Sequence, residues 1–252
     1  MPGLQAAPIG SVTIITRLDN DPALDPLVQP RLSVIIPLLN EARAVRQFGA
    51  AWQTMAASGA EVLLVDGGSE DGTLVLIQQL GLQVVAAERG RGRQLQAGAE
   101  RSRGEILLFL HADTQLPADG LELVRRSLHS PHCWGRFDVR IDGQQRMLAV
   151  VAWAMNLRSR LSGIATGDQA MFMTREAYRQ SGGFTPQPLM EDVDLSARLK
   201  ALAPPVCLKA QVTTSGRRWE RNGVVRTILL MWSLRLAYRL GVPASTLARL
   251  YR

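Results

Sequence analysis

Two stretches decide the fold: residues 32–41 read LSVIIPLLNE, and residues 61–73 read EVLLVDGGSEDGT. Each opens with a short, continuous apolar run rich in β-branched residues, which is typical of a strand buried on both faces. Each then runs through a polar turn into a helical pattern. Such βαβ units predict a parallel sheet, in which ligands bind beyond the carboxyl ends of the strands.

The same alternation continues along the chain. We predict strands at Leu32–Leu38, Glu61–Val65, Leu82–Ala86, Ile106–Leu110, Trp134–Ile141, Ala170–Thr174 and Val206–Val212. Helices are expected over residues 40–58, 73–80, 91–102, 119–128, 145–161 and 191–202. The predicted fold class is α/β, with a doubly wound, mostly parallel sheet and helices on both faces.

Composition and charge bound the class of protein. The 252 residues are 46% hydrophobic and 20% charged, close to the globular average, which excludes wholesale disorder. We divide the chain into a weakly ordered leader over residues 1–31, a catalytic domain over 32–222 and a basic helical tail over 223–252. The leader lacks the apolar run of a signal peptide. Cys133 and Cys207 form no CxxC pair, so we expect a reducing, cytoplasmic location.

The net charge of +7 is concentrated at the end of the chain. Residues 214–252 hold eight arginines and one acid, so 8 − 1 = +7, the whole excess. A nucleic-acid binder would more often spread a basic stripe over its fold, so we expect no nucleic-acid partner. The apolar stretch 224–240 is interrupted by arginines and is too short to cross a bilayer, which takes about 20 residues. It either packs on the domain or on a partner copy in a homodimer, or it docks peripherally on a membrane surface.

Two of the predicted strands run into aspartate. Asp66 follows EVLLV, and His111-Ala-Asp113 follows ILLFL, so these carboxylates should point into the ligand crevice. In extended geometry His111 and Asp113 share one side of the chain. Oxygen and imidazole ligands together suit Mn²⁺ or Mg²⁺ holding a diphosphate. A role for His111 as a hydrogen-bonding neighbour of the metal stays open.

Two further motifs are candidates for anion binding. The loop Arg89-Gly-Arg-Gly-Arg93-Gln94 combines glycines, arginines and a helix N-terminus, which can bind a phosphate. A merely solvated basic loop is the alternative. After the last strand, Arg218 and Trp219 could clamp a diphosphate and pack on a sugar or acceptor.

Met190-Glu191-Asp192 opens a predicted helix. Acids at a helix N-terminus are routinely stabilised by the helix dipole and need no catalytic role. Asp192, with Glu191 beside it, could instead be a general base that removes a proton from an acceptor hydroxyl.

Five motifs in this order resemble the family 2 glycosyltransferases, whose α/β fold is called GT-A. They are PLLNE, DGGSEDGT, HAD, MED and SGRRW, and the resemblance covers roughly residues 32–220. It implies metal-dependent, inverting transfer of a sugar from a nucleotide-diphosphate donor to a hydroxyl or carboxylate acceptor. The acceptor would be a small molecule or a lipid.

The resemblance also implies site residues, which we carry over position by position. Pro37, Asn40 and Glu41 would border the nucleotide base, and Asp66 would read it. Asp113 would hold the metal, Asp192 would be the base, and Arg218 with Trp219 would face the diphosphate or acceptor. His111 departs from the family pattern, because it stands where the first aspartate of D-x-D is expected.

RGRGRQLQAGA, LFLHADT, GDQAMFM and TSGRRWER also resemble a small bacterial subgroup of arsenosugar-biosynthesis or diaponeurosporenoate-type glycosyltransferases. Two alternatives to sugar transfer remain. A sugar-phosphate nucleotidyltransferase usually needs a glycine-rich, lysine-bearing loop after the first strand, which PLLNE does not supply. A basic module that binds a membrane or nucleic acid would rely on the tail alone.

Overall fold

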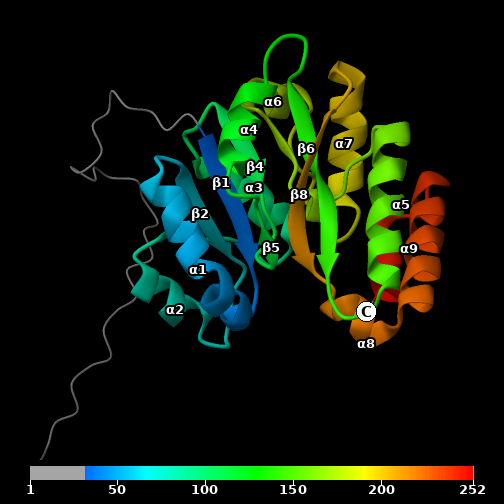
Figure 1. The fold of residues 1–252 in the computed structure, drawn as a ribbon, viewed down its shortest axis with the longest axis horizontal. Helices are drawn as coiled ribbons and strands as arrows, with labels where there is room; N and C mark the ends of the chain where they lie inside the picture. Colours follow the sequence, from blue (N-terminus) through cyan, green and yellow to red (C-terminus); the bar gives the residue numbers. More distant parts are fainter. Residues whose placement is uncertain (1–31, 252) are drawn as a thin grey trace, which may run out of the picture.

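We analyse a computed structural model, which describes residues 32–251; the predicted leader lies outside this range. One mixed sheet has the strand order β3-β2-β1-β4-β7-β6-β8-β5 (Figure 1). Its strands are β1 Leu32–Leu38, β2 Glu61–Asp66, β3 Gln83–Ala86, β4 Ile106–Phe109, β5 Thr114–Gln115, β6 Trp134–Asp142, β7 Phe172–Thr174 and β8 Val206–Ser215. Four of its seven pairings are parallel, so the predicted α/β class is confirmed.

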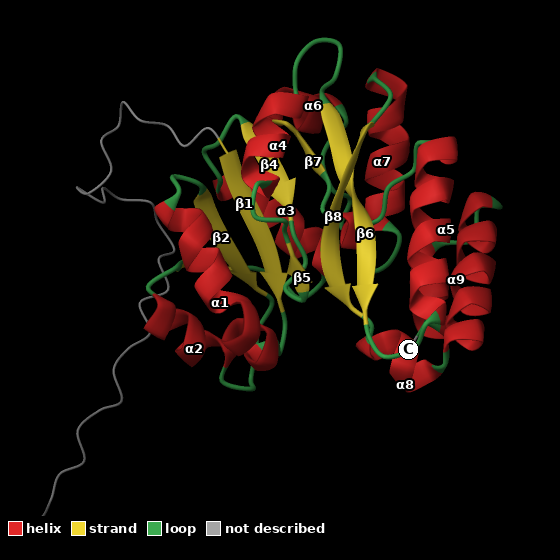
Figure 2. Cartoon of the chain, viewed as in Figure 1, coloured by secondary structure: helices red, strands yellow, loops and turns green. Residues whose placement is uncertain are grey.

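Helices cover both sides of this sheet (Figure 2). They are α1 Ala42–Ala57, α2 Thr73–Leu80, α3 Arg91–Arg101, α4 Gly120–Ser127, α5 Met147–Ser162, α6 Arg175–Gln180, α7 Glu191–Leu202, α8 Arg217–Asn222, α9 Val224–Arg239 and α10 Ala244–Leu250. A short 3₁₀ turn, η1, spans Gly167–Gln169. The sequence pattern did not predict β5, α6 or α8, because each is too short to show a period, whereas α9 and α10 lie in the segment predicted to be a helical tail.

The core lies in two clusters, one on each face of the sheet. Val34 and Ile36 of β1 join the cluster that packs beneath α1, whereas Ile35 joins the cluster beneath α3. All three side chains are fully buried. A strand with both faces covered has no polar face, which explains why β1 reads as a continuous apolar run.

The strand directions place many loops at one edge of the sheet. The parallel strands β1, β2 and β4 end there, and β7 begins there because it runs antiparallel to β4. Both β6 and β8 also end there. The two-residue strand β5 pairs with the end of β8, which ties the loop after β4 to the start of α8. The motifs singled out above therefore meet at this carboxyl edge.

The tail is helical and its inner side packs on the domain. Val224 of α9 joins the cluster beneath α1, to which α5 also contributes. Leu234 and Leu247 pack with Leu189 and Met190, just before α7. No helix within residues 32–251 is both long enough and apolar enough to span a membrane. The division of the chain at residue 222 stays a prediction.

Close packing of α3 predicts how a glycine substitution behaves. A Cβ at Gly98 would lie 2.5 Å from Ile35 Cγ2 and 2.9 Å from Val65 Cγ2 in the sheet, whereas one at Gly49 in α1 would meet the flexible end of Leu80. Gly98→Ala should destabilise the fold by about 1–3 kcal/mol through overpacking. Gly49→Ala should cost less, because alanine gains up to about 1 kcal/mol in helix propensity. Urea unfolding measures both, and a stabilised Gly98→Ala variant would contradict this packing.

Candidate active site

The loops after β1 and β2 are joined by hydrogen bonds at the carboxyl edge. The amide of Asn40 donates to Ser69 Oγ at 2.9 Å, and Asn40 Oδ1 accepts from the amide of Glu70 at 2.8 Å. The amide of Glu41 donates to Thr73 Oγ1 at 2.9 Å. Asn40 has a φ of 55°, a left-handed conformation that asparagine tolerates. PLLNE and DGGSEDGT thus form one connected polar surface.

Asp66 ends β2 but turns its carboxylate into its own loop. The side chain accepts hydrogen bonds from the amides of Gly68 at 2.8 Å and Ser69 at 3.1 Å, and the residue is only 5% exposed. A buried carboxylate is costly unless its oxygens are hydrogen-bonded, and these amides meet that need. Pro37 lies half-buried in β1, next to the register pair Leu38–Asp66. Asp66 therefore holds the loop beside the strand end.

The predicted residues of the arginine-rich loop have different surroundings. Arg89 is exposed, and Arg93 forms an ion pair with Glu88 on the surface. Gln94 is buried, and its Nε2 donates to backbone carbonyls at the ends of β1 and β2, at 2.7 and 2.8 Å. Gln94 therefore ties α3 to the sheet.

Arg91, which the sequence analysis did not single out, is the arginine of this loop that enters the site. Its Nη1 lies 3.6 Å from Glu191 Oε1. Gly92 permits this approach, because a Cβ there would lie 2.5 Å from a backbone oxygen of the loop before α7. Burial opposes the charge on Arg91, but Glu191, Asp192 and Asp113 are among the neighbours that raise its pKa overall.

Asp113 lies in a turn, not in an extended segment. The amide of Thr114 donates to the carbonyl of His111 at 3.0 Å, so His111 and Asp113 do not have the extended geometry expected from the sequence. Thr114 Oγ1 then donates to Thr214 Oγ1 at 3.0 Å, where β5 pairs with β8. The carboxylate of Asp113 consequently lies 3.9 Å from Arg217 Nη2, and burial raises its pKa.

His111 lies on the other side of the turn, against η1. Its Nε2 is buried, finds no hydrogen-bond partner among residues 32–251, and touches the position that a Cβ on Gly167 would occupy. With Glu191 and Asp192 it lines a small cavity. Burial, reinforced by the charge of Arg91, lowers the pKa of His111 to about 3. The imidazole is therefore neutral at physiological pH.

Glu191 and Asp192 lie at the start of α7. Asp192 Oδ2 accepts a hydrogen bond from the amide of Gly167 at 2.7 Å, and Oδ1 accepts one from Val193 at 2.7 Å. Glu191 is 3% exposed. Burial, together with the charge of Asp192, raises the pKa of Glu191 to about 7 against the opposing charge of Arg91. The pair thus holds one readily protonated carboxyl beside one that backbone amides orient.

Two arginines from the helices α5 and α9 lie near this pair: Arg158 near Asp192 and Asp168, and Arg235 near Asp168. Burial first, and then the charge of Arg235, lowers the pKa of Arg158 to about 10. Arg158 Nε and Nη2 and Arg235 Nε are buried without hydrogen-bond partners in the described part of the chain. The acids that act on Arg158 are Asp168 in η1 and Asp192, and burial raises the pKa of Asp168.

Arg218 and Trp219 diverge after β8. The guanidinium of Arg218 lies 3.7 Å from the ring centroid of Tyr251 and donates a hydrogen bond to its hydroxyl. Burial raises the pKa of Tyr251. Trp219 is half-buried and packs against the core cluster beneath α1, at the part of it that α5 contributes. The end of the chain thus reaches back to the carboxyl edge, a contact that no sequence pattern predicts.

The structure gathers some of the predicted residues and separates others. Glu41, His111, Asp113, Glu191 and Asp192 lie around Arg91 or beside Asp113. Pro37, Asn40, Asp66, Arg89, Arg93, Gln94, Arg218 and Trp219 support or border this centre. Further charged residues near this centre are not among those predicted from the sequence: Arg91, Arg158, Asp168, Arg217 and Arg235. Arg91 lies in the RGRGR motif, where spacing does not show which of the three arginines enters the site. Arg158 and Arg235 are arginines within largely apolar helices, and no sequence motif marks them.

Asp113 is the residue that fits a metal site in which substrate phosphates would supply the other ligands. No group of three or more His, Cys, Asp or Glu side chains within residues 32–251 is arranged to hold a metal ion. The side chain of Asp113 is 32% exposed at the carboxyl edge. Mg²⁺ is typically held by one or two carboxylates together with substrate phosphates and water. Asp113 suits such a shared site.

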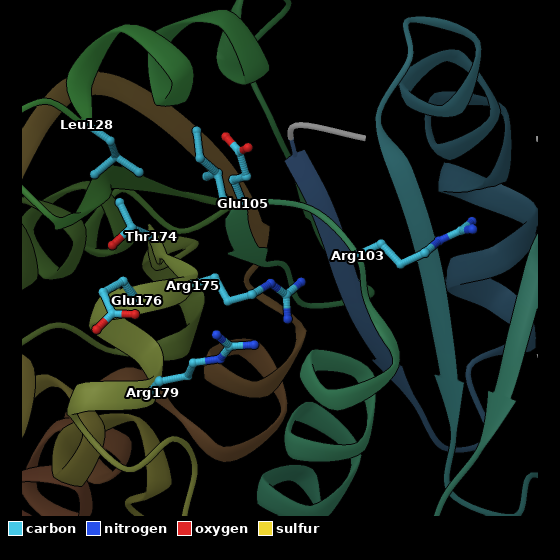
Figure 3. A pocket seen from close by; sticks show the side chains of 8 residues that line it. Arg103, Glu105, Leu128, Thr174, Arg175, Glu176 and Arg179 are labelled. Atoms are coloured by element: carbon cyan, nitrogen blue, oxygen red, sulfur yellow. The ribbon is translucent and has the colours of Figure 1, made fainter. Parts of the chain in front are cut away.

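A larger hollow at the opposite edge of the sheet has a structural explanation. Figure 3 shows its side chains, among them Arg103, Glu105 and Arg175 near the start of β4. Arg175 donates hydrogen bonds to the carbonyls of Ala99, Ser102 and Gly104 at 2.7–3.1 Å. These bonds occupy all three nitrogens of its guanidinium. Parallel strands bind ligands at their carboxyl ends, so we assign no active site here.

Comparison with known proteins identifies the family. The model described as "Glycosyl transferase family 2" matches residues 33–180, and this chain belongs to that family. The predicted resemblance to the family 2 glycosyltransferases is thereby confirmed. A mannosyltransferase from Pyrobaculum calidifontis, solved with GDP-mannose and Mn²⁺, shares the fold with a TM-score of 0.54 and 23% identity. That likeness covers 76% of this chain and 58% of the other.

Two curated relatives are similar to this chain in sequence, at about 30% identity each. The dodecaprenyl-phosphate galacturonate synthase of Rhizobium johnstonii is 30% identical over 62% of this chain and 50% of its own length. The undecaprenyl-phosphate 4-deoxy-4-formamido-L-arabinose transferase of Pseudomonas paraeruginosa is 31% identical over 60% of this chain and 47% of its own length. The chain spans about half the length of the curated relatives it matches. The finer likeness to the arsenosugar and diaponeurosporenoate subgroup stays a prediction.

The raised pKa of Glu191 predicts a pH-dependent stability. The unfolded carboxyl ionises near pH 4.5 and the folded one near pH 7, so between these values only the folded state holds the proton. The stability of the folded chain should therefore fall as pH rises from 4.5 to 7, by up to about 3 kcal/mol, and then level off. Glu191→Gln should remove this slope. Urea unfolding of both proteins at several pH values measures it; parallel curves would rule out the titration.

Proposed function

We propose that this chain transfers a sugar from a nucleotide-diphosphate donor to an oxygen of a lipid-borne acceptor that carries an anionic group. Phosphate is the first choice for that group. The observation that carries the proposal is a pair of incompletely hydrogen-bonded guanidinium groups: Arg158, which acts on Asp192 and Asp168, and Arg235, which acts on Asp168. The names of the two relatives described above both contain a polyprenyl phosphate.

The donor side consists of the loops after β1, β2 and β4. Asn40 and Glu41 border the nucleotide, with Asp66 holding their loop in shape. Asp113, Arg91 and Arg217 surround the place for the diphosphate, where two guanidinium groups stabilise its negative charge. Asp113 would hold the divalent ion, which when bound neutralises charge on the leaving diphosphate.

The acceptor side consists of η1, α7 and the inner sides of α5 and α9. Three buried N–H groups of Arg158 and Arg235 need acceptors, because an unsatisfied buried donor costs about 1–3 kcal/mol. A phosphate or carboxylate would satisfy them with charge-assisted hydrogen bonds. It would thereby bring the acceptor beside Asp192.

Asp192 is the base in this proposal. The bond between the sugar C1 and the diphosphate oxygen breaks while a bond from C1 to the acceptor oxygen forms. Where that oxygen belongs to a hydroxyl or to a singly protonated phosphate, its proton moves to Asp192. Amides of Gly167 and Val193 keep the carboxylate oriented throughout. Attack from the side opposite the leaving group inverts the configuration at C1.

A thermal-shift panel tests the donor side. One of the UDP-, GDP-, ADP- and TDP-sugars should raise the melting temperature, and Mn²⁺ should enlarge that shift, since ligands that bind only the folded state stabilise it by mass action. Asp113→Ala should lose the enlargement by Mn²⁺. Asn156→Ala, a change in α5 away from the donor loops, serves as the control for altered stability. An unchanged metal effect in Asp113→Ala would remove that residue from the metal site.

The acceptor side predicts a contrast between two kinds of variant. Asp192→Asn should lower kcat at least about 100-fold, in the range of a lost general base, while nucleotide binding is kept. Arg158→Gln and Arg235→Gln should instead raise KM for a polyprenyl phosphate about tenfold or more, with donor binding unchanged. Steady-state kinetics and calorimetry separate the two effects. Near-normal turnover of Asp192→Asn, or an unaltered acceptor KM in both arginine variants, would contradict the assignment.

A further inference from the structure

The helix α5 exposes a continuous row of large apolar side chains. The row consists of Met147, Val150, Trp153, Leu157 and Leu161, which are 39–79% exposed. Their spacing of three and four residues places them on one face of the helix. The opposite face packs into the core through Leu148, Val151 and Ala152. The exposed row is therefore not an extension of the core.

The helix α9 repeats this arrangement. Its row consists of Val225, Leu229, Trp232, Leu236 and Leu240, which are 61–76% exposed and again spaced by three and four. The inner face packs through Val224, Thr227 and Leu234. Each helix thus carries one tryptophan near the middle of an outward apolar face.

The two helices lie side by side at the end of the molecule away from α1 and α2 (Figure 1). Val224 and Ile228 of α9 pack in the same cluster as Leu148 and Val151 of α5, and Arg158 is close enough to Arg235 to lower its own pKa. With the inner sides turned toward the domain, both apolar rows face away from the sheet. Exposed apolar rows on two neighbouring helices are typical of a site that interacts with a partner.

The charged side chains of the two helices are all arginines. On α9, Arg239 borders the apolar row on one side and Arg226 on the other, at 100° per residue, and both are exposed. On α5, Arg160 also borders the row, but its Nη2 is paired with Asp138 Oδ2 of β6 at 2.5 Å, so the charge offered to a partner lies on α9. Neither helix contains a single Asp or Glu. The surface therefore complements an anionic partner.

We propose that the outer faces of α5 and α9 together dock on an anionic lipid bilayer. The helices lie in the plane of the interface, with the apolar rows below the headgroups and the arginines against them. Trp153 and Trp232 take the interfacial position that tryptophan favours in membrane proteins. At 16 residues each, the helices offer about 24 Å of contact along the surface.

A second copy of the chain fits this surface less well. In a two-fold contact the same face meets itself, so Arg226 and Arg239 would approach a partner surface whose two helices carry no acid. A bilayer with anionic headgroups supplies the missing negative charge. The inference goes beyond the proposed function, because binding to a bilayer requires neither donor nor acceptor.

Docking in this way would also give α5 and α9 two roles. Their outer faces hold the membrane, while Arg158 and Arg235 on the inner sides face Asp168 and Asp192. An acceptor anchored in the bilayer would reach these arginines from the side on which the helices dock. Docking by the tail alone, one of the alternatives that the sequence left open, would use only half of this surface.

Vesicle flotation with the full chain tests the apolar rows. The protein should float with vesicles of phosphatidylcholine containing about 30% phosphatidylglycerol and much less with phosphatidylcholine alone. Trp153→Ser combined with Trp232→Ser should weaken binding about tenfold or more. The matched control is Val75→Ser combined with Leu202→Ser, which removes exposed apolar side chains outside both helices and should leave binding unchanged. Circular dichroism verifies folding of each variant.

A second pair of variants tests the charges. Arg226→Gln with Arg239→Gln should weaken binding to the anionic vesicles about tenfold, and added salt should weaken binding of the unaltered chain. Arg43→Gln with Arg46→Gln, exposed arginines on α1, should behave like the unaltered chain. Quenching of the fluorescence of Trp153 and Trp232 by brominated lipid should accompany binding.

Three results would overturn the proposal. The first is that the protein does not bind vesicles. The second is that the double tryptophan variant and its control bind equally well. The third is that the chain is a dimer in solution and that only the double tryptophan variant is a monomer. The last would assign the face to a second copy. Donor binding measured by thermal shift remains independent of all three, so failure of docking is distinguishable from failure of the proposed sugar transfer.

Discussion

The site depends on the pairing of Thr114 and Gln115 with the end of β8. Two residues are too few to add much stability of their own, yet this pairing joins the loop after β4 to the segment that begins α8. Asp113 is thereby brought next to Arg217, a residue about one hundred positions away in the chain. Because β8 runs parallel to β6, both strands end at the same edge of the sheet as β1, β2 and β4.

Electrostatics link the two sides of the site through Arg91. This arginine pairs with Glu191 and is also influenced by Asp113 and Asp192, so a change of charge on one side is felt on the other. Burial works in the same direction on the acids, since it raises the pKa of Glu191, Asp113 and Glu41. A diphosphate entering the site would meet cations that are already held in place.

The helices α5 and α9 show how one element can serve two surroundings. Their inner sides contribute apolar packing and the arginines Arg158 and Arg235, whereas their outer sides are apolar with basic borders. Helices apolar on both sides have a small directional contrast, so sequence periodicity alone cannot tell which side is buried. Only packing against the domain decides this, and it leaves Trp153 and Trp232 outside.

The sequence by itself determined the alternation of strands and helices, the edge of the sheet at which the motifs meet, and the membership of the family. Buried parallel strands read as continuous apolar runs, so β1 and β2 could be predicted with their bounds nearly unchanged. The helices α2 and α7 were also predicted with the bounds that the structure has. The tertiary structure decided which charged side chains meet. It turned His111 away from Asp113 by a tight turn, used Asp66 and Gln94 to hold loops, and brought in Arg91, Arg217, Arg158 and Arg235. The physical reason is that these contacts join residues far apart in the chain, and neither local propensity nor spacing encodes such distances.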